Sequence, residues 1–367
     1  MRHISNIAGV ALCNALAIQG ASAALFPDLH KNTDFDRAIS ISTESVADQV
    51  EYSPNLDDGG FLAPEKRSRY QAARFEYSQQ TDSRSVLKVS LAQREMTSLR
   101  DSYDVSQLEL KGIHRISKPS ATYFFDLALS ASFNHTDRLH KNSYTTYDGN
   151  LITRSSIDNP QDQSLDISII GGLKLGHGFS VRALSGGGFT RTDHRSVNGV
   201  GRSADGCQYA FSTDGKGGSL NQLGTCGDVI SYQQTFADEE GVGERLGFRA
   251  SKDIAYLASF IQMGSEIGWS TQRFTASLGY RYRRYFRGEL DQNIEDEGRT
   301  AVRVSQLLDA QLTYSPSAKW RLSFSATYHS APFLDDIPFL YTAFTSERYH
   351  DADALSFRLG GSWYFGE

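Results

Sequence analysis

Apolar and polar residues alternate at a period of two through most of this chain. The clearest example runs from Thr122 to Asn134. One side of that stretch carries apolar residues at every second position: Tyr123, Phe125, Leu127, Leu129, Ala131 and Phe133. Alternate side chains of a β-strand point to opposite faces, so the pattern predicts a strand with one apolar face and one polar face.

Strong alternation recurs in twelve segments along the chain. They are Ala38–Val50, Ser68–Gln79, Arg84–Arg94, Asp104–Ile116, Thr122–Asn134, Ser164–Gly176, Phe179–Arg191, Ile254–Trp269, Arg273–Arg287, Ala301–Tyr314, Trp320–His329 and Ala354–Phe365. No helical pattern supplies elements that could cover so many apolar faces, so we expect these faces to meet lipid. In hydrocarbon, only a helix or a closed sheet pairs all of its backbone N–H and C=O groups in hydrogen bonds. The sequence therefore predicts an all-β fold, a transmembrane antiparallel up-and-down β-barrel.

The number of strands depends on two weaker segments, Val229–Phe236 and Glu244–Ser251. A single-chain bacterial barrel has an even number of strands, which both twelve and fourteen satisfy. We favour fourteen because the weak pair has its own alternation, for example at Ile230, Tyr232 and Phe236. In the alternative, the pair forms an extracellular hairpin above a wall of twelve strands.

The connections alternate in length, as outer-membrane barrels require, with short turns in the periplasm and long loops outside. The longest polar stretches are His135–Gln163 and Thr192–Asp228, and both read as irregular loops. The acidic stretch Glu289–Glu297 reads as a solvated loop, and it lacks the spacing of a calcium-binding loop. We predict no metal site and no cofactor.

The first residues read as a secretory signal peptide, 1–23. Arg2 precedes an apolar run, and Ala21-Ser22-Ala23 resembles a cleavage site. Residues 24–37 then form a short periplasmic segment, and residues 38–367 a single barrel domain.

Composition and charge narrow the choice of function. Hydrophobic residues make up only 39% of the chain, with 18 Tyr and 21 Phe, which suits a barrel with a wet interior better than a bundle of apolar helices. The formal net charge of −6 becomes −7 when Arg2 is removed with the signal, which argues against nucleic acid as a partner. Cys207 and Cys226 remain in the mature chain, and we expect a disulfide between them.

The final strand, Ala354–Phe365, is amphipathic and rich in aromatics, with Phe357, Trp363 and Phe365 on one face. In this it resembles Gram-negative outer-membrane proteins as a class. The resemblance implies an outer-membrane location, contact with outer-membrane lipids, and recognition by the barrel-assembly machinery. Members of the class usually end on the aromatic residue itself, whereas Gly366 and Glu367 extend this chain.

Basic residues outnumber acidic ones on the faces that we assign to the barrel interior. The candidate pore-lining residues are Lys111, Arg115, Asp126, Arg273, Arg281, Arg283, Arg303, Arg321 and Arg358. Rings of Arg and Lys favour anions, so the leading hypothesis is a porin-like channel for small solutes, anions among them. Alternatively, salt bridges fill a narrow closed barrel. A second functional hypothesis is a surface-interaction or export-accessory barrel without transport activity.

A third hypothesis is an outer-membrane hydrolase. It would rest on His329 with Ser323 or Ser325, or on His114 near Asp126. Neither arrangement is specific, and no nucleophile motif stands between a strand and a helix. We therefore do not predict an enzyme.

Overall fold

The structure is a computed structural model that describes residues 36–46, 69–98, 101–117, 122–141, 145–147, 150–202, 206–226, 233–238, 251, 254–296, 300–330, 337–340 and 353–366. Outside the described residues lie the predicted signal peptide, most of the predicted periplasmic segment, and the weak strand predicted from Glu244, except for Ser251.

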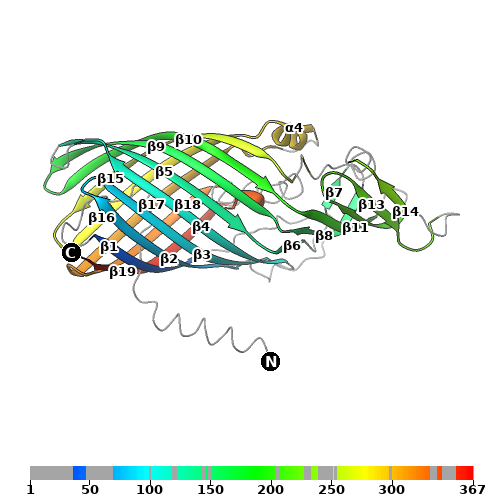
Figure 1. Ribbon diagram of the computed structural model, residues 1–367, viewed down its shortest axis with the longest axis horizontal. Coiled ribbons are helices and arrows are strands. Elements are labelled where there is room, and N and C mark those ends of the chain that lie inside the picture. The colour runs from blue at the N-terminus through cyan, green and yellow to red at the C-terminus, as the bar shows by residue number, and fades with distance from the viewer. Residues whose placement is uncertain are drawn as a thin grey trace, which may run out of the picture.

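Twelve antiparallel strands close into a barrel (Figure 1). They are β1 (Arg37–Val46), β2 (Arg69–Asp82), β3 (Ser85–Ser98), β4 (Asp101–Arg115), β5 (Tyr123–His135), β9 (Gln161–Gly176), β10 (Phe179–Asp193), β15 (Leu257–Ser270), β16 (Phe274–Phe286), β17 (Val304–Ser317), β18 (Trp320–Ser330) and β19 (Asp353–Phe365). Strand β1 closes the ring, because Ile39 lies opposite Tyr77 of β2 and opposite Trp363 of β19.

The barrel confirms the predicted all-β fold, with the alternative count of twelve strands. The favoured count of fourteen is wrong. Within the first weak segment, Gln233–Phe236 forms strand β14, which pairs with β13 outside the wall. The wall has no place for a further pair, since β10 already pairs directly with β15 from Phe179 to Arg191.

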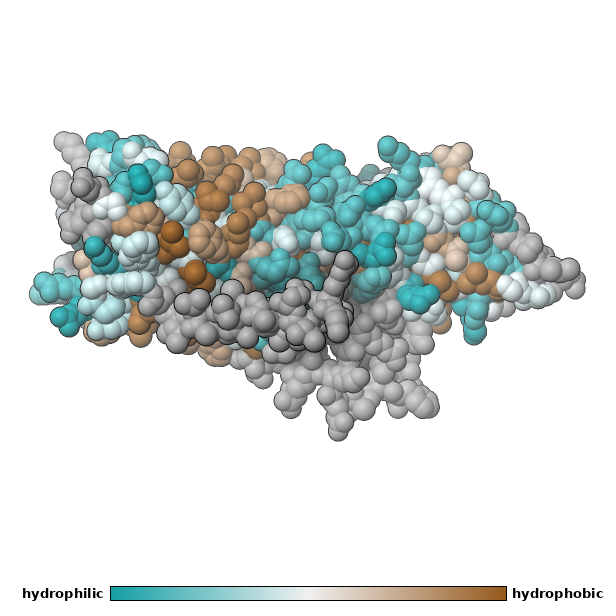
Figure 2. Space-filling model, turned by 60° about the horizontal axis from the view of Figure 1, so that its bottom comes forward, coloured by the Kyte–Doolittle hydropathy of each residue, from teal (hydrophilic) through white to brown (hydrophobic). Residues whose placement is uncertain are grey.

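An apolar belt surrounds the wall. Residues such as Phe125, Leu129, Ile169, Leu278 and Phe324 are exposed there, and Figure 2 shows the belt as a brown band over the part of the barrel away from the second sheet. The wall strands from β2 to β17 contain 13 to 16 residues, more than the roughly 9–11 that a tilted strand needs to cross a membrane. The strands therefore extend past the belt on one side, where the surface is hydrophilic.

A closed barrel with an apolar outer belt and a polar interior is a transmembrane barrel, and in bacteria such barrels lie in the outer membrane. The predicted outer-membrane location is thus confirmed. The connections β2–β3, β9–β10, β15–β16 and β17–β18 contain only two or three residues, and β1 begins and β19 ends on their side. By the rule for such barrels this side faces the periplasm, and the long connections are extracellular.

A second sheet of seven strands lies beyond the extracellular end of the barrel (Figure 1). Its strands are β6 (Arg138–Lys141), β7 (Thr145–Tyr147), β8 (Asn150–Asp158), β11 (Ser196–Arg202), β12 (Gln208–Thr213), β13 (Gly218–Gln222) and β14 (Gln233–Phe236). The β5–β9 and β10–β15 connections supply them, so the prediction that these two stretches are irregular was wrong.

The extracellular sheet buries its apolar side. Ile152, Ile157, Val197, Tyr209 and Phe211 belong to a core that continues into the extracellular end of the barrel. The predicted disulfide is present, with the Cα atoms of Cys207 and Cys226 5.4 Å apart. It joins the start of β12 to the segment after β13.

Two extracellular connections contain short helices, α4 (Glu289–Asp296) and the 3₁₀-helix η1 (Pro338–Leu340). Helix α4 replaces the predicted acidic loop, because Leu290 and Ile294 are four residues apart and both are buried. Asp291 of the same helix is buried and accepts a hydrogen bond from Arg287 Nε at 2.9 Å. None of the described helices is both long enough and apolar enough to cross a membrane.

Candidate functional site: the barrel interior

The interior of the barrel receives the polar face of each wall strand, as the alternation predicts. One ionic cluster forms on β2, β3 and β4. Arg74 donates to Glu109 Oε2 at 2.9 Å and to Gln107 Oε1 at 3.0 Å, and the Ser90 hydroxyl donates to Glu109 at 3.2 Å. Arg94 donates to Gln107 Oε1 at 2.9 Å. The strand register produces this cluster, because Ala92 lies opposite both Arg74 and Gln107.

A second ionic cluster forms on β9, β15 and β16. Arg283 Nη2 lies 3.0 Å from Asp166 Oδ2, and Gln262 bridges the pair by donating to Asp166 at 2.7 Å and accepting from Arg283 Nε at 3.1 Å. The guanidinium also lies 4.3 Å from the centre of the Phe260 ring, a cation–π contact. These contacts fix Arg283 in one position on the interior wall.

A polar cavity of about 180 Å³ lies between the two clusters. Five cationic side chains, Arg74, Arg94, Lys111, Arg281 and Arg283, line it together with two carboxylates, Glu109 and Asp166. The cavity has room for several water molecules. Its formal charge is positive, five against two, and the surrounding sheet keeps the solvent screening of that charge low.

Other predicted pore-lining residues lie in the interior but form pairs of their own. Arg115 donates to both oxygens of Asp126, at 2.8 and 3.1 Å, and its guanidinium lies 4.7 Å from the Phe124 ring centre. Both side chains of this pair are buried. Asp126 therefore belongs to an ion pair inside the barrel.

Arg321 and Arg358 also face the interior. Arg321 donates to the Tyr364 hydroxyl at 2.8 Å and stacks over that ring at 4.4 Å. Arg358 Nε lies 3.2 Å from Glu44 Oε2 on the neighbouring strand β1. The sequence-based assignment of interior residues missed Glu44. This residue lies on the same face of β1 as Ser40 and Ser42, which are buried.

Two predicted pore-lining residues lie outside the interior. Arg273 is exposed in the short β15–β16 connection at the periplasmic end. Arg303 precedes β17 and pairs with helix α4, lying 2.8 Å from Glu295 Oε1 and 3.2 Å from Asp291 Oδ2. Both were assigned by extending a predicted strand past its observed end, so neither residue belongs to a wall strand.

Sequence reasoning also missed Glu266 and Gln262 on β15. Glu266 lies 3.5 Å from Arg182 Nε of β10, and Gln262 belongs to the second ionic cluster. The alternation of apolar and polar residues in the predicted strand 254–269 shifts by one position, so the sequence did not show that both side chains face the interior. The register of β15 with β10 gives the inward phase from Phe260 through Gln262 to Glu266.

An apolar cluster lies at the extracellular end of the interior. Ile337, Phe339 and Leu340 are almost fully buried there, beside Leu290 and Ile294 of α4. Although η1 belongs to the β18–β19 connection, it contacts β9 and β10, which lie across the barrel in the strand order. Residues 337–340 therefore reach across the lumen.

Polar contacts hold η1 against the far wall. The Phe339 backbone N–H donates to Asp162 Oδ2 at 3.3 Å, and the Asn134 side chain donates to the other oxygen of Asp162 at 2.8 Å. The Tyr256 hydroxyl donates to the Pro338 carbonyl at 2.8 Å. No periodic pattern in the sequence indicates this crossing, because it depends on long-range contacts.

The residues considered for a hydrolase are not assembled as that hypothesis required. His329 Nε2 lies 3.0 Å from Ser305 Oγ of β17, rather than beside Ser323 or Ser325. His114 is exposed and bonds Ser85 at 2.9 Å, while Asp126 is buried on the opposite face of the wall. Within the described part of the chain, no group of three or more His, Cys, Asp or Glu side chains could hold a metal ion.

Comparisons with known proteins give distant similarities of fold. No family model and no curated protein matches the chain. Among solved structures, the translocator domain of the autotransporter NalP from Neisseria meningitidis matches with a TM-score of 0.46 and 9% identity, covering 92% of this chain and 91% of its own. The β domain of the Bordetella autotransporter Brka gives a TM-score of 0.43 and 11% identity, covering 90% of this chain and 100% of its own. An outer-membrane channel from Pseudomonas putida F1 gives 0.42 and 8%, covering 93% and 100%. At these values the similarities carry no functional assignment.

Proposed function

We propose that this protein is an outer-membrane channel whose interior favours small anions. The observation that carries the proposal is the cavity between the two ionic clusters inside the barrel, where five cationic side chains meet two carboxylates. A basic, weakly screened passage lowers the energy of an anion relative to a cation. The ionic clusters narrow the interior, which restricts the solutes to small ones.

The arrangement of the cations supports a role beyond filling space. Arg74 and Arg283 are held by carboxylates and amides on neighbouring strands, so their positions are fixed before any solute arrives. Lys111 lines the same cavity between these two clusters. A pre-positioned guanidinium offers several donors in a rigid fork, which suits the oxygens of an anion.

Planar-bilayer recording tests the proposal. We expect the folded protein to conduct in KCl, with a reversal potential in a salt gradient that indicates preference for chloride. The Lys111→Gln variant removes one cavity charge. A charge about 10 Å from a passing ion changes its energy by about 0.4 kcal/mol even in a water-like medium, so in this weakly screened interior the chloride preference should fall at least about twofold.

The matched control is Lys216→Gln, which removes the same charge from an exposed turn in the extracellular sheet. It should leave the selectivity unchanged. Because residues 337–340 reach across the extracellular end of the lumen, the Phe339→Ser variant is recorded in parallel and should conduct more than the wild type. Absence of conductance from both folded proteins, or a cation preference that Lys111→Gln does not alter, would overturn the proposal.

A further inference from the structure

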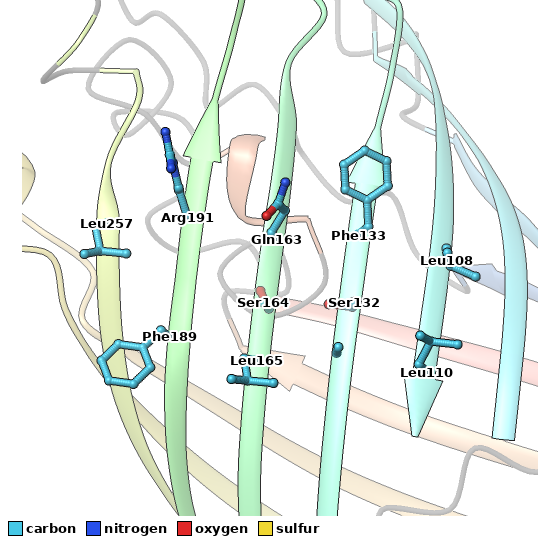
Figure 3. Close-up of a pocket in the computed structure, with 11 residues that line it drawn as sticks. Leu108, Leu110, Ser132, Phe133, Gln163, Ser164, Leu165, Phe189, Arg191 and Leu257 are labelled. Atoms are coloured by element: carbon cyan, nitrogen blue, oxygen red, sulfur yellow. The ribbon is translucent and has the colours of Figure 1, made fainter. Parts of the chain in front are cut away.

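An apolar groove of about 430 Å³ lies on the outer surface of the barrel, across β4, β5, β9, β10 and β15 (Figure 3). Its sides are the apolar residues Leu108, Leu110, Phe133, Leu165, Phe189 and Leu257. Four polar residues, Ser132, Gln163, Ser164 and Arg191, also belong to its lining.

The strand register explains why the surface is hollow at this point. Ala131 of β5 lies opposite Leu110 on one side and opposite Leu165 on the other. A methyl group between two leucines leaves a depression one side chain deep. The neighbouring residues Ser132 and Ser164 do not fill it, because their side chains lie behind the strands in Figure 3.

The groove crosses the extracellular border of the apolar belt. On β9 the exposed apolar residues end at Leu165, and Gln163 follows on the same face; on β10 Phe189 is followed by Arg191 in the same way. The apolar part of the groove therefore lies at the depth of the outer-leaflet acyl chains. Arg191 lies at the depth of their headgroups.

Arg191 gives the groove a charged end. Its side chain is 68% exposed, and its contact with Asp193 is loose, with Nη2 and Oδ2 3.4 Å apart and the Asp193 side chain 45% exposed. An exposed ion pair of this kind contributes little free energy and exchanges readily with other partners. A phosphate group offers Arg191 two oxygens at once, which a guanidinium binds as a fork.

We propose that the groove is a binding site for a phosphorylated lipid of the outer leaflet, with one acyl chain over Ala131 and a phosphate at Arg191. The position within the belt requires an apolar occupant, and the arginine at the headgroup level favours an anionic one. This site is on the lipid-facing surface, so the proposal is independent of conduction through the interior.

Native mass spectrometry of the full-length protein, titrated with diphosphoryl lipid A in detergent, tests the site. Ala131→Phe fills the depression, and Arg191→Gln removes the charge. We expect one tightly retained lipid on the wild type, and affinity about tenfold lower in each variant, the difference that one charge-assisted contact or one blocked chain makes. Matched controls are Ala310→Phe and Arg284→Gln, exposed wall positions on β17 and β16 outside the groove. Both controls should bind as the wild type does.

A neutral probe, diacylglycerol, measures the contribution of the phosphate. Arg191→Gln should not change binding of this probe, whereas Ala131→Phe should weaken it. Equal retention of diphosphoryl lipid A by the wild type and both groove variants would overturn the site. Equal affinity for the neutral and phosphorylated lipids would overturn the role of Arg191. The wild type could instead form dimers that only Ala131→Phe abolishes, and bind the phosphorylated and neutral lipids without preference. That result would assign the groove to a second copy of the chain and overturn the lipid proposal. Unchanged migration of the unheated variants in gels establishes that they fold.

Discussion

The barrel wall and the extracellular sheet are built from the same alternation, but they hide opposite faces. In the wall, Ile169 of β9 points outward and is 55% exposed, while Asp166 of the same strand points inward to an ion pair. In the sheet, Phe211 of β12 is only 3% exposed and packs inside a core, while Ser212 beside it hydrogen-bonds Asn198 on the accessible face. The alternation alone therefore identifies a strand, but it does not show whether the apolar face of that strand contacts lipid or a protein core.

The difference has an energetic consequence. The apolar side chains of the extracellular sheet leave water when they fold, so each adds hydrophobic free energy. The outward side chains of the wall also leave water, because an unfolded strand cannot stay in hydrocarbon, but they enter lipid rather than a packed protein core. The stability of the wall depends in addition on its closed ladder of backbone hydrogen bonds and on pairs such as Arg115 with Asp126 in the interior.

The largest effect should come from an identical truncation made in both regions. Phe211→Ala opens a cavity in the core of the extracellular sheet and should cost that sheet about 3–5 kcal/mol. Phe125→Ala removes a ring that faces lipid, so it loses the transfer of the ring out of water, about 1.5–3 kcal/mol, but it leaves no cavity because lipid fills the space. Hydrogen exchange followed by mass spectrometry measures both, through peptides from β11 and β12 and from β5.

The wall peptides serve as the internal control for the Phe211→Ala variant. Phe211→Ala should leave the exchange of the wall peptides unchanged, because the wall closes without the sheet. Similar losses from the two truncations would mean that both faces are buried against protein, and would contradict the assignment of the belt to lipid.

The wall was predictable because each of its strands repeats a long, regular pattern. The twelve strong segments correspond one to one with the twelve wall strands, most with ends within a few residues. The error in strand number came from β14, whose four residues alternate as a wall strand does but pair with β13. Alternation over so few residues cannot identify the partner strand.

The extracellular sheet and much of the candidate site were not predictable in this way. Strands β11 and β13 contain Gly, Ser and Asn, and β6 has only four residues, so composition indicated loops. In the interior, parity identified Arg283 and Asp126 correctly, but it could not show that Gln262 bridges Arg283 to Asp166 on a third strand. The crossing of residues 337–340 to Asp162 likewise depends on contacts between distant segments.

A smaller effect is expected from a charge placed on each outer face. Ile169→Arg puts a cation near the middle of the apolar belt and should cost about 2–4 kcal/mol. Gln208→Arg puts the same cation at an exposed position of β12 in the extracellular sheet and should change stability by less than about 0.5 kcal/mol. Urea unfolding of the protein in lipid vesicles, followed by the fluorescence of the wall tryptophans, measures the first, and hydrogen exchange of β12 the second. Equal tolerance of both substitutions would remove the contrast between the two surfaces.

The smallest effect concerns acid sensitivity, which we expect in the extracellular sheet. Asp158 of β8 accepts hydrogen bonds from Ser196 at 2.9 Å and Asn198 at 3.0 Å, and it pairs with Arg138. Burial alone would raise the pKa of this carboxyl, but the hydrogen bonds from Ser196 and Arg138 outweigh burial and hold the pKa below its ordinary value. Because the folded-state pKa is lower than the unfolded one, the carboxylate stabilises the sheet fully above the unfolded-state pKa. That contribution disappears as the pH falls through the folded-state pKa.

The Asp158→Asn variant isolates this contribution. At pH 7 its extracellular sheet should be less stable than the wild type by about 1 kcal/mol, the usual value of a hydrogen-bonded polar group that loses its best partners. The difference should shrink towards zero as the pH is lowered through the folded-state pKa of Asp158, because the wild-type carboxyl then becomes neutral as well. Hydrogen exchange of β8 and β11 peptides, compared between the two proteins at each pH, gives the difference directly. If the difference stays constant from neutral to acidic pH, then the charge of Asp158 does not stabilise the sheet, and the explanation of its acid sensitivity by this carboxylate is wrong.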